Sequence, residues 1–280
     1  MGEAKSKAAR FLQENAYCCF CGGETLATTV DHVPSRATFP MRAGPEGFEF
    51  PACVSCQTRY RAEEHYFAFI ARISDQDNAN YDRETSRRLI RGIKNNLPQM
   101  LPDIGLPANK KRRAIRNLGL SKPQGMLLRD VPIAAFPINA DEMIRKVGVK
   151  VGLALFYKQK GHAAHLDYQC CSYWTQASDI STISRWREIA SEFQGVEWGS
   201  RKNLDFGNRF RYGWAEEEPN TPEIFFTIAE FGKGISICTM IWDSILGPEV
   251  NDAPENISVA DWSRGVFPEG WPRGQRDNHQ

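Results

Sequence analysis

Several features are missing from this 280-residue sequence, and each absence excludes a class of protein. No segment reaches the roughly eighteen apolar residues that a membrane span requires, so we expect no membrane partner. The start, Met1 to Lys7, leads into no apolar run, which argues against a secretory signal peptide and for a cytoplasmic protein. No glycine-rich phosphate loop occurs, so kinase or ATP-driven motor chemistry is not expected. The net charge is only +1, so any affinity for a polyanion has to come from local patches.

Cysteine, in contrast, occurs in an informative pattern. Cys18 and Cys21 form one Cys-x-x-Cys pair, and Cys53 and Cys56 form a second. Two such pairs, separated by a loop of roughly thirty residues, are typical of a tetrahedral structural zinc site in which each pair forms one knuckle. The alternative is a pair of disulfides or unrelated core thiols, which a reducing compartment disfavours. The remaining cysteines are expected to be small core residues, and they are Cys19, Cys170, Cys171 and Cys238.

The loop that this zinc site would close carries Asp31 and His32. A carboxylate beside an imidazole, held on a metal-stapled loop, can bind a divalent cation and activate water. Imidazole suits the role of general base because its ordinary pKa lies near neutral pH. The alternative is that His32 is a surface or hydrogen-bonded core histidine without a catalytic role.

Together these motifs resemble the HNH endonuclease family, in a bacterial branch with two Cys-x-x-Cys knuckles. The resemblance is carried by Cys18 to Gly22, Thr29 to Pro34, Pro51 to Cys56 and Glu63 to Phe67. It implies a zinc-stapled ββα-metal motif and metal-dependent hydrolysis of phosphodiester bonds in DNA. It further implies a role in restriction or defence against foreign DNA.

The resemblance also implies roles for individual residues. Asp31 and Gln57 would hold one Mg²⁺ or Mn²⁺, and His32 would deprotonate the attacking water. Gln57, Arg61 and Glu64 follow one another at spacings of four and three, so on a helix they share one face that would look toward Asp31. We therefore expect Glu64 as a further ligand of the cation and Arg61 as a phosphate contact. The alternative is an ion pair between Arg61 and Glu64 within the helix.

Two positions depart from the family pattern. The family commonly has an asparagine before the second knuckle, which orients the imidazole, and an asparagine or histidine directly after the last cysteine. Glu46 and Gln57 stand there in this chain. The longer side chain of Gln57 displaces its carbonyl oxygen, and metal sites tolerate only small errors in distance. Glu46 could orient His32, or could raise its pKa and hold it protonated.

These departures leave two alternative functions beside a nuclease. One is a zinc-stapled module that binds nucleic acid with weakened cleavage, and the other is a structural subunit that contacts another protein. DNA is the expected partner, with RNA left open. Cleavage of both strands by one active site would require a second copy of the chain or two successive encounters, so a homodimer or a protein partner is left open as well.

A basic amphipathic helix is predicted after the motif, because arginine and lysine recur at helical spacing from Arg83 to Lys94, opposite Leu89, Ile90 and Ile93. We expect this helix to lie against a phosphate backbone, the alternative being a solvated helix face. The nucleic-acid contacts expected from the motif and the helix are Arg36, Arg61, Arg87, Arg91 and Lys94.

The whole chain is expected to be α+β, with the zinc-stapled motif followed by helices and a small antiparallel sheet. We predict a helix over 141–158, capped by Asp141, and strands over 210–214, 224–229 and 235–242. The expected division is 1–75 for the motif, 76–140 for the basic helical region with a proline-containing linker, 141–248 for an α+β domain, and 249–280 for an extended tail.

Overall fold

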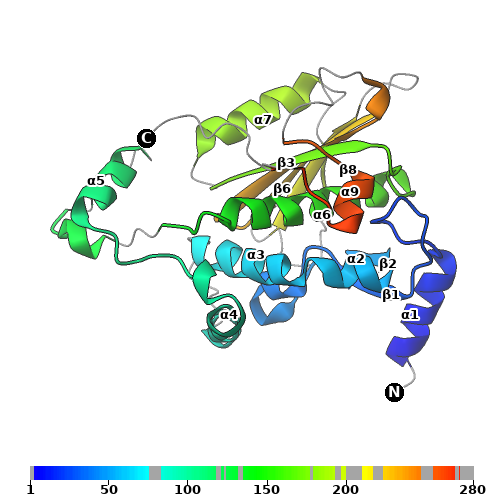
Figure 1. Cartoon of the computed structure of the whole chain (residues 1–280), viewed down its shortest axis with the longest axis horizontal. Helices are drawn as coiled ribbons and strands as arrows, with labels where there is room; N and C mark the ends of the chain where they lie inside the picture. The colour runs from blue at the N-terminus through cyan, green and yellow to red at the C-terminus, as the bar shows by residue number, and fades with distance from the viewer. Residues whose placement is uncertain are drawn as a thin grey trace.

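The computed structural model describes residues 3–75, 83–117, 121–122, 124–131, 135–176, 179–192, 197–199, 210–216, 223–246, 255–268 and 271. They form an α+β fold in which helices lie on both faces of an antiparallel sheet (Figure 1). The helices are α1 (Glu3–Glu14), α2 (Val54–Arg59), α3 (Arg61–Ser74), α4 (Arg83–Asn96), α5 (Ala108–Asn117), α6 (Ala140–Lys160), α7 (Ile180–Glu192) and α9 (Val259–Arg264). The strands are β1 (Thr29–His32), β2 (Glu49–Ala52), β3 (Gln169–Gln176), β4 (Glu197–Gly199), β5 (Phe210–Glu216), β6 (Ile224–Phe231), β7 (Ile235–Trp242) and β8 (Ile257–Ser258).

The main sheet has the strand order β4-β5-β6-β7-β3-β8, and all neighbours are antiparallel. Strands β6 and β7 are joined by a tight turn at Gly232, whose φ of 58° is the left-handed conformation that glycine adopts without strain. The three predicted strands correspond to β5, β6 and β7. Strand β3, which carries Cys170 and Cys171, lies between β7 and β8 and was not predicted.

Helix α6 is the centre of the molecule, since it packs on β3 and β7 of the sheet on one side and on α3 on the other (Figure 1). Its contact with the sheet is close because two glycines one turn apart face it. A Cβ atom on Gly148 would lie 2.0 Å from Ser172 Oγ, and one on Gly152 would lie 2.4 Å from Thr239 Cγ2. The helix is followed by Gly161 in the left-handed conformation, but Asp141 does not cap its start as predicted. The Asp141 carboxylate instead accepts hydrogen bonds from Arg145 and Trp174.

The cysteine-rich motif forms a second, smaller layer beneath α6. Strands β1 and β2 pair as an antiparallel hairpin in which Asp31 lies opposite Phe50 and His32 opposite Glu49. Helix α2 follows β2 directly, so the chain has a strand–strand–helix order in this region. The helix expected to run on from α2 is divided at Tyr60, and α3 begins at the next residue.

The segment 249–280 contains regular structure where an extended tail was expected. Strand β8 pairs with β3, and α9 follows it. Trp262 of α9 is fully buried, and its ring lies 4.6 Å from that of Tyr60. Burial of this large aromatic side chain offsets the entropy cost of ordering the segment. The contact joins distant parts of the chain, so the positions of the tryptophans in the sequence do not predict it.

The larger cluster of buried apolar residues extends across the predicted segment boundaries. It includes Phe20 and Phe67 of the first segment, Phe156 and Phe225 of the third, and Trp262 of the last. The first segment is therefore packed into the body of the protein. Among the described residues, no helix is long and apolar enough to cross a membrane.

Candidate metal centre and acid site

Four cysteines come together at the end of the β1–β2 hairpin, as the sequence predicted. Cys18, Cys21, Cys53 and Cys56 are all buried, and their sulfur atoms lie within 4.8 Å of one another. Four thiolates around one point are the ligand set of a structural zinc site. The donor set therefore fits zinc, which would join the segment before β1 to the start of α2.

The surroundings of the cluster fit metal ligands rather than ordinary core thiols. The backbone N–H of Phe20 donates to Cys18 Sγ at 3.4 Å, and that of Cys56 donates to Cys53 Sγ at 3.4 Å. Mutual hydrogen bonds lower the pKa of Cys21 and raise those of Cys18 and Cys56, so these three thiols form one coupled group. Gly22 follows with a φ of 64°, and a Cβ there would lie 2.6 Å from Leu166 Cγ. The knuckle therefore requires glycine at this position.

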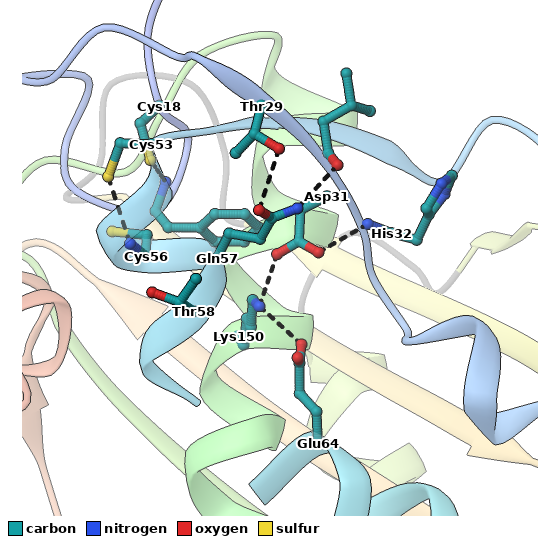
Figure 2. A network of polar contacts seen from close by, with 12 residues as sticks. Cys18, Thr29, Asp31, His32, Cys53, Cys56, Gln57, Thr58, Glu64 and Lys150 are labelled. Carbon is teal, nitrogen blue, oxygen red and sulfur yellow. Dashed lines mark hydrogen bonds and ion pairs between the residues drawn. The ribbon is translucent and has the colours of Figure 1, made fainter. Parts of the chain in front are cut away.

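Beside the cluster, strand β1 presents Asp31 toward helix α6, where the carboxylate meets Lys150 (Figure 2). The Lys150 Nζ atom lies 2.7 Å from Asp31 Oδ2 and 2.7 Å from Glu64 Oε1 of α3. The Lys150 side chain is 0% exposed, and those of Asp31 and Glu64 are 11% and 13% exposed. One buried ammonium thus bridges two carboxylates from two different elements. We call these three residues the acid–lysine triad.

Lys150 is held in its charged form by its attraction to the two carboxylates. Burial by itself lowers the pKa of Lys150, but the charges of Glu64 and Asp31 outweigh it and raise that pKa above the ordinary value. Burial raises the pKa of Glu64, an effect that the charge of Lys150 opposes. Asp31 is further stabilised by the backbone N–H of His32, which donates to Oδ1 at 2.9 Å. Lys150 is therefore a permanent cation at this site.

His32 lies on the open side of β1, turned away from the triad (Figure 2). Its side chain is 32% exposed, and its Nδ1 atom lies 3.8 Å from Glu49 Oε1 on the paired strand. Burial lowers the pKa of His32, Arg36 lowers it further, and Glu49 and Asp31 oppose the shift. His32 is therefore neutral at pH 7, the protonation state that a general base requires.

The Gln57 amide forms hydrogen bonds to the two residues that precede Asp31 in β1. Its Nε2 atom donates to the carbonyl oxygen of Val30 at 3.1 Å, and its Oε1 atom accepts from the Thr29 hydroxyl at 3.1 Å (Figure 2). The amide thereby ties α2 to β1. Glu46, the other departure from the family pattern, is exposed in the loop before β2.

The acid site as arranged does not fit a catalytic divalent cation. Asp31 and Glu64 were expected to bind the cation. One carboxylate oxygen of each, Asp31 Oδ2 and Glu64 Oε1, contacts the Lys150 ammonium instead. The carbonyl oxygen of Gln57, the third expected ligand, is engaged by Thr29. A cation at this point would meet a like charge instead of a free set of oxygen ligands.

The expected nucleic-acid contacts are all on the surface. Arg36 is exposed near His32, and Arg61 is exposed at the start of α3. On α4, Arg87, Arg91 and Lys94 are exposed. Helix α4 packs on α3 and also contacts the short 3-10 helix Pro40–Arg42, which follows β1 in the hairpin connection. Helix α4 therefore adjoins the motif. Ile90, expected on the apolar face, is 40% exposed, whereas Leu89 and Ile93 are buried.

Lys150 is the site residue that sequence reasoning missed. It lies on α6 among Val147, Val151 and Ala154, which are buried apolar residues. A lysine at the spacing of an apolar face is the available signal, because a buried ammonium requires a carboxylate partner. The sequence does not name that partner, since Asp31 and Glu64 are far away along the chain.

No protein-family model, no curated protein and no solved structure matches this chain. The assignment of a function therefore rests on the geometry of the zinc cluster, the acid–lysine triad and the basic surface.

Proposed function

We propose that this chain is a nucleic-acid-binding protein built on a zinc-stapled ββα motif whose metal-dependent cleavage is weakened or lost. The observation that carries the proposal is Lys150, which takes up both carboxylates that an HNH-like site would offer to a cation. DNA is the proposed ligand, and the binding surface is the basic side of α4 together with Arg36 and Arg61.

The framework supports binding because it is rigid. The cysteine cluster fixes both ends of the β1–β2 hairpin, and Gln57 ties α2 to the first strand. The triad joins the same strand to α3 and α6. A surface held in this way keeps its charged side chains in a fixed arrangement, which reduces the ordering cost of binding.

The basic surface supports a polyanion as the ligand. Helix α4 exposes Arg87, Arg91 and Lys94, which recur at spacings of four and three and so lie along one side. Arg88 is not counted in this basic stripe, because its guanidinium pairs with the Glu84 carboxylate at 2.9 Å. A basic stripe along a helix is the pattern that contacts phosphates without reading bases, so we expect affinity with little sequence preference.

The binding test is fluorescence anisotropy with labelled duplex DNA, single-stranded DNA and RNA over a series of salt concentrations. Each lost phosphate contact reduces the slope of log K against log salt by about 0.9 for duplex DNA. Replacing Arg87, Arg91 and Lys94 by glutamine should therefore reduce the slope by about 2 to 3 and weaken binding.

The matched control removes the same charge elsewhere, with Lys7, Arg10 and Arg185 replaced by glutamine. These residues are exposed on α1 and α7. The control should leave the slope almost unchanged. Salt-independent affinity, or equal slopes for both triple variants, would refute the proposed surface and favour a protein-interaction subunit.

A second candidate, an HNH-like endonuclease, is favoured by the geometry of His32. Its imidazole is partly exposed, burial lowers its pKa, and Glu49 Oε1 lies 3.8 Å from Nδ1. The test is incubation of supercoiled plasmid, linear duplex, single-stranded DNA and RNA with Mg²⁺ or Mn²⁺. Cutting that EDTA and His32→Ala both abolish would establish the nuclease. Binding without cutting on every substrate would support the main proposal.

A further inference from the structure

We infer that the Lys150 ammonium is the resident cation of the Asp31 and Glu64 carboxylates, and that its charge is what keeps divalent metal ions out of this acid site. The inference concerns the same site as the proposed function, but it does not depend on nucleic-acid binding. It makes Lys150 the residue that determines which cation the site holds.

The geometry places the ammonium where a bridging metal ion would lie. Lys150 Nζ is 2.7 Å from one oxygen of each carboxylate, so both oxygens point to one atom. A Mg²⁺ ion at the same point would need oxygen distances of about 2.1 Å, which small movements of two carboxylates can provide. Two carboxylates with water molecules filling the other positions are a common ligand set for Mg²⁺.

The ammonium cannot move aside into solvent. Lys150 is 0% exposed, and its Nζ atom lies 5.4 Å from the centre of the Phe20 ring. Helix α6 is packed against α3 on this side and against the sheet on the other. Any divalent ion that entered would therefore share the site with the buried positive charge of Lys150, which is unfavourable in a poorly solvated place.

The charge balance points the same way. Two carboxylates and one ammonium leave one formal negative charge, which the backbone N–H of His32 helps to stabilise at Asp31 Oδ1. Replacing Lys150 by methionine keeps most of the apolar stem and removes only the charged end. The acid pair would then be buried without a counter-charge, and a divalent cation would neutralise it completely.

The test is titration of the zinc-loaded protein with Mn²⁺, followed by electron paramagnetic resonance and calorimetry in the absence of nucleic acid. Lys150→Met should gain one Mn²⁺ site with a Kd at least about tenfold below that of any site in the wild type. Adding Asp31→Asn to Lys150→Met should remove the site. Lys150→Arg, which keeps the charge, should exclude Mn²⁺ as the wild type does.

Lys146→Met is the matched control, because it removes the same charge from α6 one turn earlier. Lys146 pairs with Glu142 at 2.6 Å and lies 3.9 Å from Glu63, so it also leaves carboxylates behind. Circular dichroism establishes which variants are folded. The inference is overturned if folded Lys150→Met binds no Mn²⁺, or if Lys146→Met gains a Mn²⁺ site of equal affinity.

Measurements on the wild type keep the inference falsifiable even if Lys150→Met does not fold. A tight Mn²⁺ site in the wild-type protein that Asp31→Asn abolishes would show that the ammonium does not exclude the metal. Weak Mn²⁺ binding that Asp31→Asn does not change would support the exclusion of divalent ions from the acid site. Loss of DNA binding in the anisotropy test would refute the proposed function while leaving these metal titrations unaffected.

Discussion

Removing only the ammonium from the acid–lysine triad should destabilise the protein far more than removing all three charges. Lys150→Met leaves two carboxylates whose side chains are 11% and 13% exposed without their common partner. Breaking a buried ion pair from one side costs about 3–5 kcal/mol in the free energy of unfolding. The neutral triple variant with Asp31→Asn, Glu64→Gln and Lys150→Met should stay within about 1–2 kcal/mol of the wild type, because no uncompensated charge remains.

The assay is urea unfolding of the zinc-loaded protein at pH 7 without added divalent cation. A change in the midpoint at constant m-value reports stability alone. Lys146→Met should cost only about 1 kcal/mol, because its partner Glu142 is 39% exposed and can be solvated. The reasoning fails if Lys150→Met and the triple variant lose the same stability, since the loss would then come from packing and not from stranded charge.

The pH dependence of Lys150→Met gives an independent signature. Burial raises the pKa of Glu64 above its ordinary value of 4.5, and removing Lys150 removes the main opposing charge. The folded state then binds more protons than the unfolded state between the two pKa values, so stability falls as pH rises through that window. The deficit relative to the wild type should therefore shrink as the pH is lowered toward 4.5. A deficit that is constant with pH would contradict the stranded carboxylate.

Four further predictions follow from individual positions. Cys53→Ser should lower the zinc content from about one ion per chain and abolish cooperative unfolding, as measured by elemental analysis and circular dichroism. Gly152→Ala should cost about 1–3 kcal/mol, because its Cβ would lie 2.4 Å from a Thr239 methyl carbon. Trp262→Ala should cost about 3–5 kcal/mol in urea unfolding, because the ring is fully buried. Burial lowers the pKa of His32 in the folded state, so protonation of this residue should lower the free energy of unfolding as the pH falls below 6.5. His32→Gln should lack this part of the pH dependence.

The cysteine cluster and much of the secondary structure were predictable from the sequence because their signals are local. The spacing within each Cys-x-x-Cys pair indicates a metal-binding knuckle without reference to the rest of the chain. The structure brings the two pairs together as predicted. Strands β6 and β7 are apolar runs joined by the glycine turn at Gly232. Helix α4 shows its exposed basic side in the spacing of Arg87, Arg91 and Lys94.

The parts that could not be predicted depend on contacts between distant segments. Strand β3 is fixed by β7 and β8, which pair with its two edges. The order in 255–268 depends on Trp262 packing on Tyr60, about two hundred residues earlier in the chain. Gln57 was expected to bind a metal ion. Its amide instead forms hydrogen bonds with Val30 and Thr29, which lie close to it only in the folded chain.

The triad shows why the motif alone is a poor guide to what this chain does. Asp31 and Glu64 belong to the first segment, whereas Lys150 lies in the middle of α6 and is placed by the packing of that helix between α3 and the sheet. The region outside the motif therefore supplies the positive charge that the motif's carboxylates require. Two chains with the same cysteine pairs and the same Asp-His pair would differ in chemistry if one had an apolar residue at this position in the packed helix. Under the proposed function, Lys150 is the residue that would separate nucleic-acid binding from metal-dependent cleavage, and no local motif contains it.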